Sequence, residues 1–395
     1  MKVQLAERLR RADFQGDFLE MILVAATKPG IISFAGGLPN PASFPVDELA
    51  KAAQEVLHED GVIALQYSTS AGFLPLRRYI AERYAKSGII LDPDDIIITN
   101  GSQQALDLVS GALLDDGDVV VVERPCYLAA LQVFHLYNPV VRTVELTPEG
   151  VAVDELREII ERDKPKFFYS VPNFQNPTGL TYSEAVRHGV AESLRGSDTM
   201  ILEDNPYGDL RFRGLPGTSF HTLLGEQCLM FGSFSKIVSP GLRIGWIACT
   251  NKELREQIVS YKQRVDMHTN IFGQMVLARY LQDCDLEAHI EKIKELYGHQ
   301  ADVMLGAMSR YFPEGTRWTK PDGGMFIWAE LPEGLQAVQL ADAAAKAGVA
   351  IAAGDPFYEV DRGVRTMRLN YTNCDDGAIE KGIRILGDLI RKMQQ

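Results

Sequence analysis

The chain has 395 residues, of which 46% are hydrophobic and 24% are charged, and its formal net charge is −13. This composition is typical of a soluble globular protein, and the length predicts one large or two medium domains. The acidic charge and the lack of a basic cluster argue against nucleic acid as a partner.

The cysteines and histidines do not form the pattern of a metal site. The five cysteines are scattered without a Cys-x-x-Cys pair, and the seven histidines are dispersed. We therefore expect reduced thiols, no disulfide framework and no bound metal. The charged N-terminal segment contains no apolar run of signal-peptide length, and no stretch of about 18 apolar residues follows. The expected location is the cytoplasm, with no membrane span.

The first two thirds of the chain predict an α/β unit. Residues 1–30 have the pattern of a charged amphipathic helix, and a Gly/Pro-rich loop over 31–44 precedes a helix from Pro45 to about His58. Helical patterns at 75–86 and 102–114 then alternate with short apolar runs, which predict a mostly parallel sheet covered by helices on both faces. The runs are 96–99, 119–122, 167–171, 200–202, 229–231 and 244–248.

The last third predicts a smaller α+β unit. A helical region over about 252–308 has few breakers and contains a helix that links the two units. The patterns that follow predict strands at 323–328, 349–352 and 366–370 and helices at 338–347 and 375–393. We therefore expect a large domain over 45–285 and a small domain made of 1–44 and 286–395.

The most informative segment, residues 233–246, places a lysine among phosphate-binding residue types. Ser233, Ser235 and Arg243 carry the hydroxyl and guanidinium groups that hold a phosphate dianion. Lys236 carries an amine that forms a Schiff base with an aldehyde. An aldehyde and a phosphate on one aromatic molecule describe pyridoxal phosphate (PLP). The alternative is an exposed loop lysine.

Two further candidates follow the apolar run at 200–202. Ligands of open α/β sheets bind beyond the carboxyl ends of strands. Asp204 is placed there to pair with a pyridinium nitrogen, and Tyr207 to hydrogen-bond the 3-oxygen of the ring. The alternative is an ordinary Asp-Asn-Pro turn.

Other strand ends carry polar residues of the same kind. Asn176 follows the run at 167–171 and can donate to the same 3-oxygen, unless it only belongs to a turn. Gly101, Ser102 and Gln103 open a helix, where backbone amides form an anion site. Ser102 is expected to be both helix cap and phosphate ligand, and a simple N-cap is the alternative.

An aromatic residue and an arginine complete the set. Tyr127 can stack on the ring or belong to the core. Arg368 lies in the predicted strand 366–370, where a buried guanidinium is costly unless it is paired. It can clamp a substrate carboxylate or form an internal salt bridge.

Together these motifs resemble the aspartate-aminotransferase superfamily, fold type I of the PLP enzymes, over nearly the whole chain. The resemblance is closest to the branch with α-aminoadipate, kynurenine and archaeal aromatic or multisubstrate aminotransferases. The matching motifs occur in order at residues 33–39, 65–68, 101–107, 174–179 and 232–236.

The resemblance implies an α/β fold whose large domain has a mostly parallel seven-stranded sheet. It implies that Lys236 is the Schiff-base lysine and proton shuttle. It implies that Arg368 holds the α-carboxylate of the substrate, and that Gly37 and Asn176 also contact the substrate. It also implies a homodimer in which Tyr67 reaches the phosphate of the partner's cofactor. The cofactor-binding set would be Tyr67, Gly101, Ser102, Gln103, Tyr127, Asn176, Asp204, Tyr207, Ser233, Ser235, Lys236 and Arg243.

One position departs from the branch. Aminoadipate-using members carry an arginine on the N-terminal helix for the distal carboxylate, and the corresponding residue here is Glu20. A glutamate would repel that carboxylate, so Glu20 favours a neutral or cationic substrate side chain, or it simply faces solvent.

The sequence therefore predicts a PLP-dependent aminotransferase that moves an amino group between an L-amino acid and a 2-oxo acid by a ping-pong mechanism. Aromatic, aliphatic or broad specificity is expected. One alternative is a β-lyase or decarboxylase on the same fold. A remote alternative is a PLP-binding regulator, which would need a DNA-binding segment that the first 30 residues do not resemble.

Overall fold

The computed structural model describes residues 3, 4, 6, 8, 18 and 30–395. The helix predicted over residues 1–30 and the side chain of Glu20 therefore lie outside the described residues. Phe18 is described, and it packs against apolar side chains of the C-terminal unit.

Within the described residues, the large sheet has eight strands in the order β2-β9-β8-β7-β6-β3-β4-β5. Strands β8, β7, β6, β3 and β4 are parallel neighbours, whereas β9 runs antiparallel between β8 and β2, and β5 antiparallel to β4. The bounds are β2 Ile96–Thr99, β3 Val119–Arg124, β4 Val140–Thr147, β5 Gly150–Val151, β6 Phe167–Ser170, β7 Met200–Asp204, β8 Cys228–Ser233 and β9 Gly245–Ala248.

The mostly parallel sheet between helices is confirmed, with one strand more than the seven expected. The added strand β5 has two residues and forms a short hairpin with β4. Strand β4 was missed because it lies near the edge of the sheet and is half-exposed, so its sequence mixes apolar and polar residues. The central strands are buried along their length, which is why they were recognised as continuous apolar runs.

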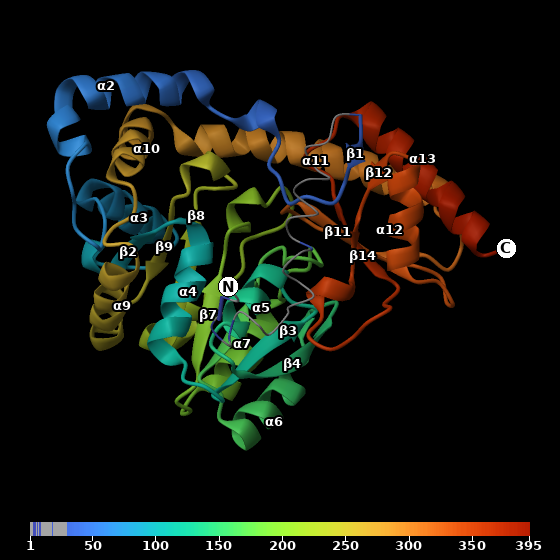
Figure 1. Cartoon of the computed structure of the whole chain (residues 1–395), viewed down its shortest axis with the longest axis horizontal. Helices are drawn as coiled ribbons and strands as arrows, with labels where there is room; N and C mark the ends of the chain where they lie inside the picture. Colours follow the sequence, from blue (N-terminus) through green and yellow to red (C-terminus); the bar gives the residue numbers. More distant parts are fainter. Residues whose placement is uncertain (1–2, 5, 7, 9–17, 19–29) are drawn as a thin grey trace.

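Helices cover the large sheet (Figure 1). Helix α2 continues past the predicted stop at His58 to Ala64, with a kink at Asp60. The predicted helical region 252–308 is three helices, because Asn270 and Asp285 accept hydrogen bonds from backbone amides and cap new helices. The bounds are α2 Val46–Ala64, α3 Leu74–Lys86, α4 Gly101–Leu113, α5 Leu128–His135, α6 Val153–Asp163, α7 Glu184–Leu194, α8 Phe220–Leu224, α9 Lys252–Val265 and α10 Ile271–Asp283.

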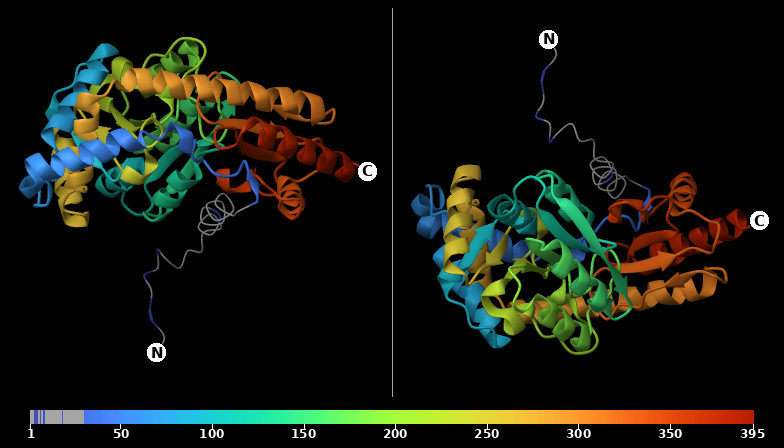
Figure 2. Two further views of the ribbon diagram at one scale, coloured as in Figure 1. Left: turned by 90° about the horizontal axis from the view of Figure 1, so that it is seen from above. Right: turned by 90° about the horizontal axis from the view of Figure 1, so that it is seen from below.

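A second unit lies at the C-terminal end of the long helix α11 (Leu286–Tyr311), which runs from the large sheet to this unit in all views (Figures 1 and 2). Its sheet has the order β10-β11-β14-β13, and a parallel pair joins β1 to β12. The bounds are β1 Ile32–Ser33, β10 Arg317–Trp318, β11 Phe326–Glu330, α12 Ala337–Lys346, β12 Val349–Ala350, β13 Ala352–Ala353, β14 Thr366–Asn370 and α13 Asp376–Met393. The domain boundary near residue 285 stays a prediction.

The topology brings the candidate residues to one edge of the large sheet. Strands β2, β3, β6, β7 and β8 point the same way, so their carboxyl ends meet there. The segments that follow these strands carry the predicted motifs, and β14 of the second unit supplies Arg368. In the part of the chain that is described, no helix has the length and apolar character needed to cross a membrane.

Candidate active site

Asp204 ends strand β7 and is almost completely buried. The hydroxyl of Tyr169 donates to its Oδ2 at 2.8 Å, whereas its buried Oδ1 has no hydrogen-bond partner among the described residues. Burial raises the pKa of Asp204 to about 7, although the Tyr169 hydrogen bond opposes this shift. A buried carboxylate oxygen without a donor is ready to accept a hydrogen bond from a ligand.

Lys236 lies in the turn after β8 and donates from Nζ to the carbonyl of Gly37 at 2.8 Å. Burial, together with the charges of Arg368 and Arg243, lowers the pKa of Lys236 to about 8. No ion pair to Lys236 is found among the described residues. Its amine is therefore neutral far more often than that of an exposed lysine, which makes it a nucleophile and a base.

Arg368 is buried in β14 without an acidic partner among the described residues. It donates to Asn176 Oδ1 at 2.8 Å and to the Ala35 carbonyl at 2.6 Å, and its Nε has no hydrogen-bond partner in the part of the chain that the structure describes. Its guanidinium carbon lies 4.4 Å from the ring centroid of Phe326 and 5.0 Å from that of Phe357. Burial lowers the pKa of Arg368 to about 10. The described residues thus contain no internal salt bridge at this position, and the cation is available to a ligand carboxylate.

Asn176 connects Arg368 to Tyr207. Its Oδ1 accepts from Arg368, and its Nδ2 donates to the Tyr207 hydroxyl at 3.3 Å. Burial raises the pKa of Tyr207, so this hydroxyl keeps its proton and can donate to a ligand oxygen. Both residues lie where the sequence predicts them, beyond the ends of β6 and β7.

A positively charged cradle lies at the N-terminus of α4. Gly101 has φ +71°, and a Cβ there would lie 2.5 Å from Arg243 Nη2. A Cβ on Gly245 would lie 2.7 Å from the Gly101 carbonyl carbon, so both glycines allow close approach. Arg243 donates to the Asn100 carbonyl at 3.3 Å, which holds the guanidinium beside the first amides of the helix. Such an arrangement binds anions.

The remaining cofactor candidates surround this cradle. The amide of Ser235 donates to Ser233 Oγ at 3.1 Å. The expected capping role of Ser102 is wrong, because α4 begins at Gly101 and Asn100 occupies the N-cap position. Gln103 donates to the Ala129 carbonyl at 3.3 Å. The roles of these four side chains as phosphate ligands stay predictions.

Three candidates lie at other positions. Tyr127 occupies the N-cap position of α5, and burial raises its pKa to about 12. Gly37 packs against Phe326, since a Cβ would lie 3.1 Å from its Cζ. Tyr67 is 78% exposed, and its ring meets that of His268 edge-on, at 6.1 Å between ring centroids. No hydrogen bond among the described residues joins its side chain to this chain's own site.

Two residues at the site were missed in the sequence. Tyr169 reads as a member of an apolar strand, and only the parallel register of β6 and β7 brings it to Asp204. Glu123 is a fully buried carboxylate near the end of β3. A glutamate directly after the apolar run of residues 119–122 was the signal that could have found it.

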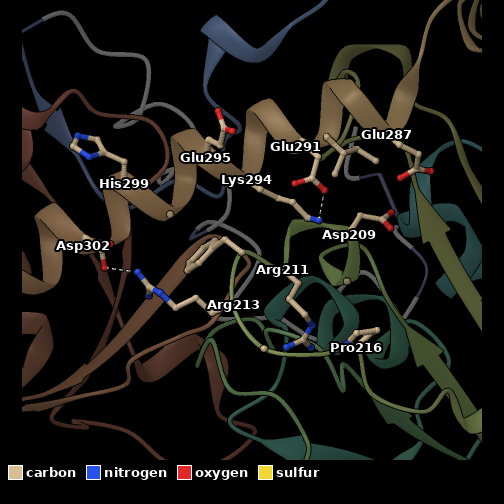
Figure 3. A pocket seen from close by; sticks show the side chains of 15 residues that line it. Asp209, Arg211, Arg213, Pro216, Glu287, Glu291, Lys294, Glu295, His299 and Asp302 are labelled. Atoms are coloured by element: carbon tan, nitrogen blue, oxygen red, sulfur yellow. Dashed lines mark hydrogen bonds and ion pairs between the residues drawn. The ribbon is translucent and has the colours of Figure 1, made fainter.

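A cleft of about 610 Å³ lies elsewhere, between residues 208–216 and α11 (Figure 3). None of the predicted site residues that the structure describes lines it. Several of its charges are paired with one another, since Arg213 contacts Asp302 at 2.6 Å and Lys294 contacts Glu291 at 2.7 Å. Among the described residues no group of acids, histidines and cysteines suited to a metal ion occurs. The strand-end site is therefore the better candidate for catalysis.

Comparisons with known proteins identify the family of the chain. The family model described as "Aminotransferase class I and II" matches residues 31–386. An aromatic-amino-acid aminotransferase of Thermococcus litoralis is 42% identical over 92% of this chain and 88% of its own length. Two solved structures superpose on the chain, and each match covers 99% of this chain and 98% of the other. They are a kynurenine aminotransferase of Pyrococcus horikoshii with PMP (39% identity, TM-score 0.93) and an α-aminoadipate aminotransferase of Thermus thermophilus with a phosphopyridoxyl-leucine (36%, 0.91).

Proposed function

Because this chain belongs to the class I and II aminotransferases, we propose that it transfers an amino group between an L-amino acid and a 2-oxo acid, with preference for apolar and aromatic side chains. The observation that carries the proposal is Arg368. It is a buried guanidinium with no acidic partner in the described part of the chain, and its charge acts directly on Lys236. A cation for the substrate carboxylate thus lies beside the nucleophilic amine.

The residues of the site fit PLP. The Oδ1 atom of Asp204, which has no donor among the described residues, can accept a hydrogen bond from a protonated ring nitrogen. The cradle of Gly101 and Arg243 at the start of α4 suits a phosphate dianion. The Tyr207 hydroxyl and the Asn176 amide suit the 3-oxygen, and Tyr127 lies close enough to Asp204 for their charges to interact. We propose that these side chains, with Ser102, Gln103, Ser233 and Ser235, hold the cofactor.

When bound, PLP supplies an aldehyde that condenses with amines and a ring that accepts electron density. Every other part of the chemistry falls to the protein. Lys236 Nζ, with its pKa near 8, takes the proton from the substrate Cα. Arg368 fixes the α-carboxylate and thereby orients the Cα–H bond toward that amine. The carboxylate of Asp204 stabilises positive charge at the ring nitrogen.

The surroundings of Arg368 support the proposed side-chain preference. Phe326 and Phe357 contact the guanidinium. Phe357 packs on Trp328 with ring centroids 5.8 Å apart, within a cluster that also contains Leu128. Apolar walls favour aromatic and aliphatic substrates. The name of the Thermococcus relative points the same way.

We also propose a homodimer with Tyr67 at the interface. Tyr67 lies among exposed apolar side chains, since Val62 is 90%, Leu65 76% and Met267 51% exposed. Exposed apolar residues that gather in this way mark an interaction surface. The contact of Tyr67 with His268 joins the two segments that carry them.

The substrate preference is tested with PLP-loaded protein and 2-oxoglutarate. L-Phenylalanine, L-tyrosine, L-leucine, L-2-aminoadipate and L-lysine are offered as donors, and kcat/KM is compared. We expect the aromatic and aliphatic donors to exceed aminoadipate and lysine by about tenfold or more. Equal or better use of lysine would overturn the preference, and release of free ammonia without acceptor would favour the β-lyase alternative.

Mixed dimers test the interface. Lys236→Ala and Tyr67→Ala proteins are unfolded and refolded together. If Tyr67 serves the partner's site, each mixed dimer regains one intact site, up to about a quarter of wild-type activity. No regain in a mixture shown to contain mixed dimers would contradict a shared site.

A further inference from the structure

Glu123 is a buried carboxylate that the chemistry above does not use. It lies in β3 with an exposed fraction of 1%. Its carboxylate accepts hydrogen bonds from four groups: Tyr182 OH at 2.6 Å, Gln175 Nε2 at 2.8 Å, the Val171 amide at 2.9 Å and Ser170 Oγ at 3.2 Å. Burial raises the pKa of Glu123 and these hydrogen bonds lower it, so the donors offset the cost of the buried charge.

The donors belong to one stretch of chain. They come from the end of β6 and from the turn at residues 171–182 that follows it. This stretch carries Asn176, whose side chain is hydrogen-bonded to Arg368. Glu123 therefore joins the end of β3 to the loop that presents the substrate-side amide.

Gln175 is the link between the two. Its Nε2 donates to Glu123 Oε2 and to the Pro125 carbonyl, at 2.8 and 2.9 Å. Its Oε1 accepts from the Thr178 amide and hydroxyl, at 2.9 and 2.7 Å. All polar atoms of this side chain are satisfied, and the side chain is fully buried. A fully connected polar network of this kind fixes the backbone on both sides of Asn176.

We propose that Glu123 is a positioning residue for substrate binding, which acts through Gln175 to hold Asn176 against Arg368 and Tyr207. This role rests on the proposed function, because it concerns how the carboxylate clamp is oriented. Glu123 itself does not touch Asn176 or Arg368 in any hydrogen bond of the described residues. Its loss should therefore weaken the grip on the substrate carboxylate more than it weakens the hold on the cofactor.

Glu123→Gln tests the link with little change of shape. The glutamine side chain has one NH2 group, which cannot accept a hydrogen bond, whereas both carboxylate oxygens of Glu123 accept. If the NH2 group faces Gln175, the Gln175 hydrogen bond is lost; if it faces Ser170, a hydrogen bond to β6 is lost. The matched control is Glu203→Gln, which removes a second buried glutamate on β7, the strand on the far side of β6 from β3. Glu203 accepts from Ser219 Oγ at 2.6 Å and from the Phe220 amide at 3.0 Å, away from the 171–182 turn.

Binding of 3-phenylpropanoate, which carries a carboxylate but no amine, is measured by calorimetry on PLP-loaded protein, together with KM and kcat for L-phenylalanine. We expect Glu123→Gln to raise both the Kd and the KM by about tenfold, the change that one buried hydrogen bond produces. The Kd of PLP should rise less than that of 3-phenylpropanoate, because Asn176 supplies only one of several proposed contacts to PLP. The values for Glu203→Gln should stay within about twofold of wild type.

A second variant keeps the test decisive if Glu123→Gln fails to fold. Gln175→Met removes the link while it keeps the volume, and it should raise the same Kd by about tenfold. The exchange Glu123→Gln with Gln175→Glu restores a donor opposite an acceptor and should recover part of the binding.

Unchanged Kd and KM in folded Glu123→Gln or Gln175→Met, or equal losses in Glu203→Gln, would overturn the positioning role. If wild-type protein transaminates but does not bind 3-phenylpropanoate, the clamp that this role serves is refuted; if it does not transaminate at all, the proposed function fails first.

Discussion

Asp204 should destabilise the protein in the absence of cofactor, and Asp204→Asn should remove that cost. In the folded chain burial raises the pKa of Asp204 to about 7, whereas an aspartate in the unfolded chain titrates near about 4. At a pH between these two pKa values, the carboxyl group of Asp204 is protonated in the folded state and ionised in the unfolded state. Folding stability at this site is therefore greatest below about pH 4 and is lost as the pH rises to about 7.

The size of the loss follows from the shift. Each pH unit well inside the window costs about 1.4 kcal/mol, and the cost per unit falls near the folded pKa. Between pH 5 and pH 7 the wild-type apoprotein therefore loses about 2 kcal/mol relative to a variant that does not titrate there, and by pH 8 the loss approaches about 3 kcal/mol. The other buried carboxylates, Glu123 and Glu203, are present in both proteins and largely cancel in the difference. The asparagine itself adds an unpaired buried amide, which costs a similar amount at every pH and leaves the pH dependence unchanged.

The assay is urea unfolding of the apoproteins at several pH values from 5 to 8. We expect the free energy of unfolding of Asp204→Asn, minus that of wild type, to rise by about 3 kcal/mol over this range. The exposed Asp198→Asn variant is the matched control and should parallel wild type. Parallel curves for Asp204→Asn and wild type would refute the reasoning, because they would mean that this carboxylate is not buried without a full set of donors.

Three other predictions follow from the same site. In the apoprotein, labelling of Lys236 by an amine reagent, followed by peptide mass spectrometry, should have a midpoint near pH 8, and a midpoint near about 10.4 would contradict the buried, cation-flanked setting. Arg368→Gln should lower kcat/KM for L-phenylalanine about a hundredfold but that for phenylethylamine, which lacks the carboxylate, far less; equal losses would argue against the clamp. Tyr169→Phe should raise the pKa of Asp204 by about one unit or more, seen as an upward shift of the pH window in apoprotein unfolding, and an unmoved window would show that the hydroxyl does not stabilise the carboxylate.

Much of the site could be predicted because parallel strands end at one edge of a sheet. Asp204, Asn176 and Lys236 each follow an apolar run, so recognising those runs as parallel strands was enough to bring the residues together. The identity of each residue then indicated the chemistry. Arg368 was predicted differently, from the cost of a guanidinium inside a strand.

The parts that were missed depend on register and on contacts between distant segments. Tyr169 meets Asp204 only through the pairing of β6 with β7, which no local pattern specifies. Lys236 donates to Gly37, 199 positions away in the chain. Strand β4 was missed because a half-exposed strand near an edge has no continuous apolar run. The sequence predicted a helix that begins at Ser102. Helix α4 begins at Gly101, which has a positive φ, so Asn100 and not Ser102 occupies the N-cap position.

Transfer of isotope-labelled nitrogen tests the central claim most directly. PLP-loaded protein is incubated with L-phenylalanine labelled at the amino nitrogen and with unlabelled 2-oxoglutarate, and the products are separated by mass spectrometry. The account predicts the label in glutamate, formed together with phenylpyruvate in equal amount, and no transfer by the Lys236→Ala protein. Label found in free ammonia, or no transfer from this or any other donor of the panel, would contradict it.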